Sequence, residues 1–316
     1  MKTTKLLVLP ILLSALTTVA NTIPLNYNSG STTISATPFT GYRYDIFQWS
    51  TPMGSCSTDP KLSELTWKNH IFETGVKVET KPEDKNFNFL GQLKYGIILN
   101  QSNRQDSDWD NLGEFSKVMS SVKGNVFDLS GAIGVSRQVS SVLATYYFGM
   151  DYTNYQIKDY GLNYKVNRSR YGHTIEELGQ VNPKSQLVSK YSFNNYAPWI
   201  GSSFLLPLTE KFSVKPTIKG YLFYLTSKAD WILRDDYKHP TSFTDKAFGT
   251  GVSFDTELLY QYHKNLDIYT KIEIKMLKML NGRKKNYAYN DNTLSHDLKK
   301  LSFMSSSISG GIKYKF

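Results

Sequence analysis

Two aspartates that lie two residues apart are the first candidates for chemistry in this 316-residue chain. Asp106 and Asp108 lie in the polar segment 105–110. Side chains two apart point to the same side of an extended segment, so these two carboxylates are expected to lie close together. Neighbouring carboxylates raise one another's pKa and can hold a water molecule for general-base chemistry. The alternatives are a solvated acidic loop and a weak cation site.

A second polar segment, 230–240, carries two aspartates and a histidine close together: Asp235, Asp236 and His239. An aspartate that orients an imidazole can make it a general base near neutral pH. The alternative is a surface loop in which the histidine is incidental. If both segments lie on the same side of one scaffold, their side chains can form a single site.

The elements that must position these residues are strands, because apolar and polar residues alternate along much of the chain. In the segment 304–316, apolar Met304, Ile308, Ile312 and Phe316 alternate with serines and lysines. Period two is typical of a strand with one apolar and one polar face. The same alternation recurs in 72–79, 87–100, 213–224 and 266–276. A Lys or Glu at every second position cannot face a protein core, but it can face the wet lumen of a membrane barrel.

The connections between these strands alternate in length. The short turns are expected at 82–85, 137–140, 206–211 and 262–265. The long polar loops are expected at 49–62, 101–121, 165–184, 229–246 and 279–300. Four turns and five loops join ten strands, and an even number closes the sheet without an edge. We therefore expect an all-β fold, a ten-stranded antiparallel transmembrane β-barrel with long extracellular loops and both termini on the short-turn side.

The first twenty residues have the pattern of a secretory signal peptide. Lys2 and Lys5 precede an apolar stretch that ends in the small-residue sequence Thr18-Val19-Ala20, and the stretch is too short for a comfortable transmembrane helix. We expect residues 1–20 to be removed and residues 21–316 to form a single barrel domain in the cell outer membrane. The chain has a single cysteine, Cys56, so no disulfide framework is expected.

Composition narrows the classes of partner. Loss of Lys2 and Lys5 with the leader lowers the formal net charge from +10 to +8, and the basic residues are scattered along the chain. Such a basic chain with 22 tyrosines suits the interface of an outer membrane and its anionic lipid headgroups. No nucleic-acid-binding module is present, so nucleic acid is not an expected partner. No phosphate-binding loop, dinucleotide fingerprint or metal motif is visible, so no cofactor or metal is expected.

Several segments of the chain resemble the omptin family of outer-membrane endopeptidases. These segments are Leu62-Ser-Glu-Leu-Thr-Trp-Lys68, Asp106-Ser-Asp-Trp109, Ala197-Pro-Trp-Ile-Gly201, Asp230-Trp231 and Gly311-Ile-Lys-Tyr-Lys-Phe316. The resemblance implies a ten-stranded barrel that projects from the membrane. It also implies a groove at the top, where an aspartate pair faces an Asp–His pair and activates a water molecule that attacks a peptide bond, commonly next to basic residues.

The resemblance carries over directly to one half of this site, the aspartate pair, but not to the other half, the Asp–His pair. The aspartate pair matches Asp106 and Asp108 directly. The family has Asp-x-His, whereas this chain has Asp236 and His239 separated by two residues. Side chains three apart point to opposite faces of a strand, so a bulge or a kinked loop is needed to bring them together. We assign Asp236 and His239 to the Asp–His pair, with Asp235 as the alternative acid.

The chain departs from the family at two further sites. Where omptins carry an acidic residue that holds a basic substrate side chain, this chain has Tyr42, and Asp235 is the remaining candidate acid of that pocket. Where omptins carry a Tyr-x-Glu-x-Arg lipopolysaccharide site, this chain has Met150, Tyr152 and Asn154. Without a guanidinium, bidentate phosphate binding there is lost.

The resemblance implies an endopeptidase that acts on peptide or protein substrates at the surface of a Gram-negative cell, with its active face extracellular. Asp106 and Asp108 are expected to polarise the water, His239 to accept its proton and Asp236 to orient His239. The alternative is a proteolytically inactive omptin-like barrel that serves as a surface adhesin or interaction protein. A small porin is a weaker third reading, because about ten strands leave little lumen once side chains fill it.

Overall fold

The structure is a computed structural model that describes residues 32–82, 87–167, 179–290 and 292–316. The expected leader, residues 1–20, and the start of the expected barrel domain lie outside the described residues, as does most of the expected turn at 82–85. Residues 32–316 form one compact unit. No helix of the described residues is long and apolar enough to cross a membrane.

Every regular element that the structure describes is a strand. The strands are β1 (Thr32–Pro52), β2 (Lys61–Pro82), β3 (Phe87–Ile98), β4 (Asn103–Asp110), β5 (Gly113–Val139), β6 (Val142–Asn167), β7 (Gly179–Gln180), β8 (Leu187–Pro207), β9 (Phe212–Asp230), β10 (Phe243–His263), β11 (Leu266–Tyr287), β12 (Thr293–Asp297) and β13 (Lys300–Lys315). All ladders between them are antiparallel.

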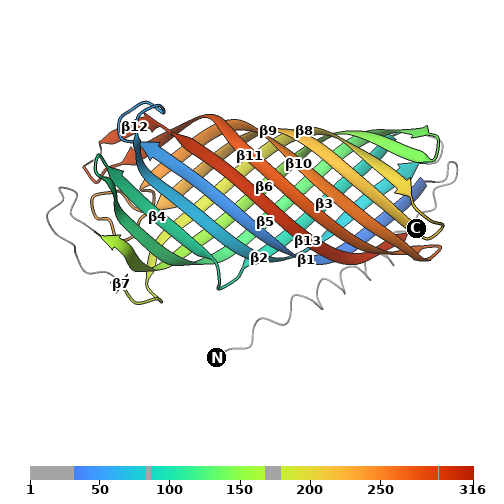
Figure 1. The fold of residues 1–316 in the computed structure, drawn as a ribbon, viewed down its shortest axis with the longest axis horizontal. Coiled ribbons are helices and arrows are strands. Elements are labelled where there is room, and N and C mark those ends of the chain that lie inside the picture. Colours follow the sequence, from blue (N-terminus) through green and yellow to red (C-terminus); the bar gives the residue numbers. More distant parts are fainter. Residues whose placement is uncertain (1–31, 83–86, 168–178, 291) are drawn as a thin grey trace. The chain divides into compact units, whose positions relative to one another are not determined.

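The strands close into a barrel with ten positions around the ring (Figure 1). β1 pairs with both β2 and β13, which closes the sheet. β3 and β4 follow one another in a single position, because both pair with β2 on one side and β5 on the other. The short strands β7 and β12 only extend β6 and β11. The expectation of a ten-stranded antiparallel barrel is confirmed.

At one end of the barrel, which we call the loop end, β1 is joined to β2 by residues 53–60, β4 to β5 by 111–112 and β9 to β10 by 231–242. The upper ends of β6, β8, β11 and β13 lie at the same end. The expected long loop at 101–121 is wrong: the chain turns at 99–102 and then continues as β4 and β5, which Asn111 and Leu112 join. Asp106 and Asp108 therefore lie on a strand. Their neighbours are polar on both faces because this part of the wall stands above the apolar belt, so the sequence pattern is that of a loop.

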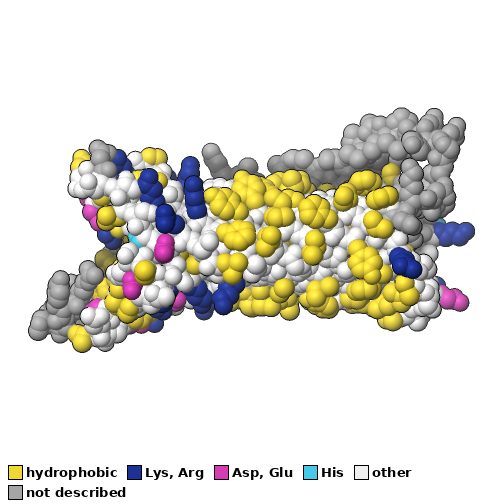
Figure 2. Space-filling model, turned by 90° about the horizontal axis from the view of Figure 1, so that it is seen from above, with side chains coloured by type: hydrophobic (Ala, Val, Ile, Leu, Met, Phe, Trp, Pro, Cys, Tyr) yellow, Lys and Arg dark blue, Asp and Glu magenta, His cyan; other side chains and the backbone are white. Residues whose placement is uncertain are grey.

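The outer face of the barrel is an apolar belt. Its exposed side chains include Ile97, Ile133, Phe148, Ile200, Ile218, Val252, Ile272 and Ile308. Figure 2 shows yellow apolar side chains over the middle of one face of the barrel, with Lys, Arg, Asp and Glu towards its two ends and most of them at the loop end. So large an exposed apolar surface is unfavourable in water and suits a hydrocarbon layer. The belt is the apolar face that the period-two pattern predicts.

The lower part of the lumen contains paired charges. Arg43 donates to Asp45 at 2.9 Å, to Asp128 at 2.7 Å and to the Tyr155 hydroxyl at 2.7 Å. Glu79 accepts from Lys215 at 2.7 Å and, with other lysines, forms a second group of ion pairs. The charged face of the strands points inward as expected, and its charges pair with one another across the lumen.

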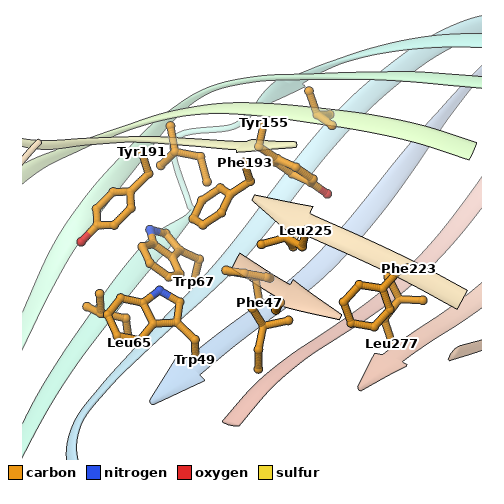
Figure 3. Close-up of a cluster of buried hydrophobic side chains, with 14 of the residues drawn as sticks. Phe47, Trp49, Leu65, Trp67, Tyr155, Tyr191, Phe193, Phe223, Leu225 and Leu277 are labelled. Carbon is orange, nitrogen blue, oxygen red and sulfur yellow. The ribbon is translucent and has the colours of Figure 1, made fainter. Parts of the chain in front are cut away.

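The upper lumen is packed with aromatic and aliphatic side chains, which we call the lumen core (Figure 3). The Trp67 and Tyr191 ring centroids lie 4.8 Å apart in an edge-to-face contact, and those of Phe47 and Phe193 lie 4.6 Å apart. Trp67 has no exposed surface. Packing of this kind occupies the cross-section of a ten-stranded barrel. It also forms the floor on which the loop-end cavity is built.

Candidate functional site

A cavity of about 550 Å³ opens at the loop end, above the lumen core. Its titratable lining residues include Arg104, Asp106, Asp108, Arg234, Lys284 and His296. Its aromatic lining residues are Trp49, Phe115, Tyr164, Trp231, Tyr237 and Phe243. Mixed apolar walls with a few convergent charged groups are typical of ligand sites.

The aspartate pair lies on β4 and lines this cavity. Asp106 is paired across the sheet with Leu65 on β2 and Val118 on β5, and Asp108 lies two residues further along. Both side chains face the cavity, as their spacing predicts. Burial, opposed by Arg104 and assisted by the Asp108 carboxylate, raises the pKa of Asp106 to about 7.

Arg104 does not neutralise Asp106 by a close ion pair. Its Nη1 donates to Asp159 at 3.1 Å and to Ser189 at 2.8 Å, whereas its Nη2 stays 3.8 Å from Oδ2 of Asp106. Oδ1 of Asp106 is buried and accepts no hydrogen bond from the described residues. A buried carboxylate oxygen without a hydrogen bond favours the protonated form of the group, which agrees with the raised pKa of Asp106.

Lys284 and His296 stand on another part of the wall, where β12 pairs with β11 and makes these two residues direct cross-strand partners. β11 and β4 are separated by β13, β1 and β2 around the ring. Burial lowers the pKa of Lys284 to about 8, although Asp245 and Asp106 act in the opposite direction. Burial, and then the Lys284 ammonium, lowers the pKa of the half-buried His296, which keeps its imidazole neutral at pH 7.

His239 is not part of this cavity lining. Its Nδ1 lies 2.6 Å from Oδ1 of Asp230, at the end of β9. Ser227 and Ala229 are buried inside the barrel and Lys228 is exposed, so alternation places Asp230 on the outer side. Asp230 itself is largely covered, but its cross-strand partner Lys190 is exposed. The His239–Asp230 pair therefore lies outside the wall that encloses the aspartate pair.

Asp236 is not the partner of His239, which corrects our assignment. Its carboxylate accepts two hydrogen bonds from Arg234, at 2.7 and 2.6 Å, and this contact lowers the pKa of Asp236. The 231–242 loop returns to the end of β9, where the Ser242 amide donates to the Ala229 carbonyl at 2.8 Å. This closure brings residue 239 back to Asp230, nine positions earlier in the sequence, and the local Asp–His spacing does not decide the pairing.

The two residues expected to bind substrate also lie away from the cavity lining. Asp235 is exposed on the 231–242 loop. Tyr42 lies in the middle of β1 on the outer face, between its cross-strand partners Phe72 and Ile308, and its hydroxyl contacts the ring of His70. Tyr42 thus belongs to the apolar belt, and its assignment to a substrate pocket is wrong because its side chain has the outward parity.

Sequence reasoning missed Lys284 and His296 because the segment 279–300 is polar and has the composition of a loop. β11 in fact continues to Tyr287, and β12 folds back along it. The alternation before residue 280 turns Lys271 and Leu277 inward, and by itself it predicts an outward side chain at position 284. A register shift between the Gly249–Met279 and Phe248–Asn281 pairs reverses this parity, so simple alternation does not locate Lys284. Within the described ranges, no group of three His, Cys, Asp or Glu side chains is placed to bind a metal ion.

A closed antiparallel barrel with an apolar outer belt, a filled lumen and a cavity at one end is an outer-membrane β-barrel protein. The comparison of sequences agrees: residues 39–316 match the family described as "Pom: Protochlamydia outer membrane protein". The chain belongs to this family and is an outer-membrane protein. No curated protein matches the chain.

Among solved structures, the chain is similar to the outer membrane protease OmpT from Escherichia coli, with a TM-score of 0.76 and 14% identity over 92% of this chain and 99% of that chain. This likeness shows a shared fold. The outer membrane protein OprG from Pseudomonas aeruginosa has 9% identity over 91% and 97% of the two chains and a TM-score of 0.34. The translocator domain of NalP from Neisseria meningitidis has 13% identity over 98% and 95%, with a TM-score of 0.35.

Proposed function

We propose that this protein is an outer-membrane peptide hydrolase of omptin type whose site is the loop-end cavity. The observation that carries the proposal is the placement of Asp106 and Asp108, side by side on β4 and facing the cavity. Asp106 has a pKa of about 7, so its carboxylate is partly protonated at neutral pH. A group with this pKa is matched to proton transfer at physiological pH. The fold shared with the protease OmpT supports the same assignment.

In the proposed reaction, the aspartate pair holds a water molecule that attacks the carbonyl carbon of the scissile peptide bond. His296 replaces His239 as the acceptor of the water proton, because it is the histidine that lines the cavity among the described residues. The proton then passes to the amide nitrogen as the carbon–nitrogen bond breaks. The products are a carboxylate and an amine, and the reaction requires no cofactor.

The substrates are peptides or proteins at the cell surface. Short turns join β5 to β6, β8 to β9 and β10 to β11 at the end of the barrel where β1 begins and β13 ends. In outer-membrane barrels the short turns are periplasmic and the long loops extracellular. The cavity then faces the exterior of a Gram-negative cell.

Outer-membrane lipid is the second partner that we propose, through the apolar belt. At the position of the family lipopolysaccharide site, the Tyr152 hydroxyl and the Asn154 amide both donate to Asn194, at 2.9 and 2.8 Å. Tyr152, Asn154 and Asn194 are uncharged, and the two donors are already used in these hydrogen bonds. We therefore propose that activity does not depend on lipopolysaccharide at this position.

Peptide cleavage by the refolded barrel tests the proposal. The full chain, folded in detergent, is incubated with a mixed peptide library, and new termini are identified by mass spectrometry. We expect cleavage by the native protein and a loss of about 10²–10⁴-fold in Asp106→Asn and Asp108→Asn variants. Absence of cleavage by the native protein, or equal cleavage by all three, would contradict a hydrolytic role.

A second candidate is a peptide-binding barrel without hydrolysis, serving as an adhesin or interaction protein. The pairing of His239 with Asp230 outside the cavity favours it, because the family's Asp–His half is then absent from the site. The same library distinguishes the candidates. Peptides that are retained by the barrel but recovered intact would support the binding protein.

A further inference from the structure

Lys284 is a buried cation without a close anionic partner. It is 6% exposed, and its Nζ lies 3.3 Å from the ring centroid of Phe243 and 3.9 Å from that of Trp49. Among the described residues, no carboxylate lies within 4.0 Å of this nitrogen. The two rings hold the ammonium by cation–π contact, which replaces only part of the hydration that it loses on burial.

The other cations of the cavity already have carboxylate partners. Arg104 donates to Asp159 at 3.1 Å, and Arg234 makes two hydrogen bonds with Asp236. Among the described residues that line the cavity, Lys284 is thus the cation that can still form a close ion pair with a ligand. Asp245, its cross-strand partner on β10, instead accepts from Ser227 at 2.5 Å.

We propose that Lys284 binds a carboxylate of the peptide and so makes the cavity select acidic ligands. The inference rests on the proposed function in one respect, namely that the cavity takes a peptide. A carboxylate from an Asp or Glu side chain, or from the peptide C-terminus, would form the charge-assisted hydrogen bond that no described residue supplies to this ammonium. Selection of this kind is the opposite of a preference for Lys or Arg.

The two residues that were expected to hold a basic side chain are not among the described residues that line the cavity. Tyr42 points to the lipid side, and Asp235 does not line the cavity. The carboxylates that do line it, Asp106 and Asp108, form the proposed water site. A basic ligand side chain near Lys284 would meet a like charge in a place of low solvent access, which is unfavourable.

Peptide binding measured separately from cleavage tests the proposal. Fluorescent ten-residue peptides carry a central Glu, Gln or Lys, each with a free and an amidated C-terminus. Their affinity for the full-length barrel in detergent is read by anisotropy before cleavage proceeds, and mass spectrometry records the fraction of each peptide that is still intact. We expect the Glu peptide to bind roughly tenfold more tightly than the Gln peptide. If the free-terminus Glu, Gln and Lys peptides bind alike and amidation weakens all three by a similar factor, the bound group is the C-terminal carboxylate.

Variants at two adjacent lysines provide the control. Lys284→Met should abolish the preference for the carboxylate, and Lys284→Glu should favour the Lys peptide. Lys285→Met removes the same charge from the exposed side of β11 and should leave the preference intact. Lys284→Arg should retain the preference, and heat-shifted mobility on gels verifies that every variant is folded.

Two results would overturn the proposal: equal affinity of the native barrel for Glu, Gln and Lys peptides with either terminus, or a preference that survives Lys284→Met. The outcome of the cleavage assay is independent of this binding result. Acidic peptides that bind selectively but remain intact would contradict hydrolysis and leave Lys284 selection standing. Cleavage without any dependence on peptide charge would contradict the selection and leave hydrolysis standing.

Discussion

Nδ1 of His239 lies 2.6 Å from Oδ1 of Asp230, and this pair is on the outer side of the barrel wall. The aspartate pair that was expected to face His239 lines the cavity inside the wall. A strand offers only two faces, so a difference of one position separates a lumen-facing group from an outward one. The position of Asp230 at the end of β9 is therefore enough to remove His239 from the cavity.

Replacement of the two histidines should separate their roles. His239→Asn should leave peptide cleavage within about twofold of native, because the imidazole does not reach the cavity. His296→Asn should reduce cleavage by about 10²–10⁴-fold, which is the usual contribution of a general base. Rates on one purified peptide are the measurement. A larger loss from His239→Asn than from His296→Asn would contradict the assignment.

The stability of the barrel should depend on the ionisation of Asp106. Its pKa is about 7 in the folded protein and 3.8 in an unperturbed carboxyl, so the folded state holds a proton that the unfolded state has released. The resulting stabilisation is present below pH 4 and is lost as the pH rises to 7, by up to about 4 kcal/mol. Urea unfolding in bilayers at pH 4 to 8 measures it. Asp106→Asn should flatten this part of the profile.

Arg43 should be more important for stability than any exposed cation. Arg43→Ala leaves the buried carboxylate of Asp45 and the half-buried carboxylate of Asp128 without this cationic partner, and we expect a loss of about 3–5 kcal/mol in the free energy of unfolding. Arg283→Ala, at a position where the side chain is 74% exposed, should cost less than about 0.5 kcal/mol. Similar losses in the two variants would contradict the role of the lower ion-pair group.

Trp67 should be the most costly side chain to truncate in the lumen core. It has no exposed surface and contacts Tyr191 and Phe193 edge-on. Trp67→Ala should lower the free energy of unfolding by about 3–5 kcal/mol, because the ring leaves a cavity that the rigid wall cannot fill. On the lipid-facing belt, Phe148→Leu should cost less than about 1.5 kcal/mol. Equilibrium unfolding in lipid vesicles compares the two variants.

The filled lumen predicts that the barrel does not conduct ions. The lumen core and the Arg43 ion pairs both occupy the interior among the described residues. In a planar bilayer we expect no stepwise current after insertion of the native protein, with a known porin as the positive control. Discrete, reproducible conductance steps from the native barrel would support the porin reading instead.

The barrel was largely predictable, and the errors concern particular segments. Residues such as Ile272 and Ile308 face lipid and Lys271 faces the lumen because apolar and polar residues alternate along their strands through the belt. β4 was mistaken for a loop, since the wall above the membrane meets water on its outer face and a polar cavity on its inner face. Asp106 and Asp108 were identified despite this error because their spacing gives them the same side in either setting.

The sequence by itself determined the ring of ten strand positions, the apolar belt, and the common direction of Asp106 and Asp108. These follow from side-chain parity, which is a local property of an extended chain. Only the tertiary structure decided that His239 pairs with Asp230 and that Lys284 and His296 complete the cavity wall. Those contacts depend on where the 231–242 loop closes and on the register of β12 against β11. Both are set by packing between residues that are not neighbours in the sequence, so local side-chain parity does not predict them.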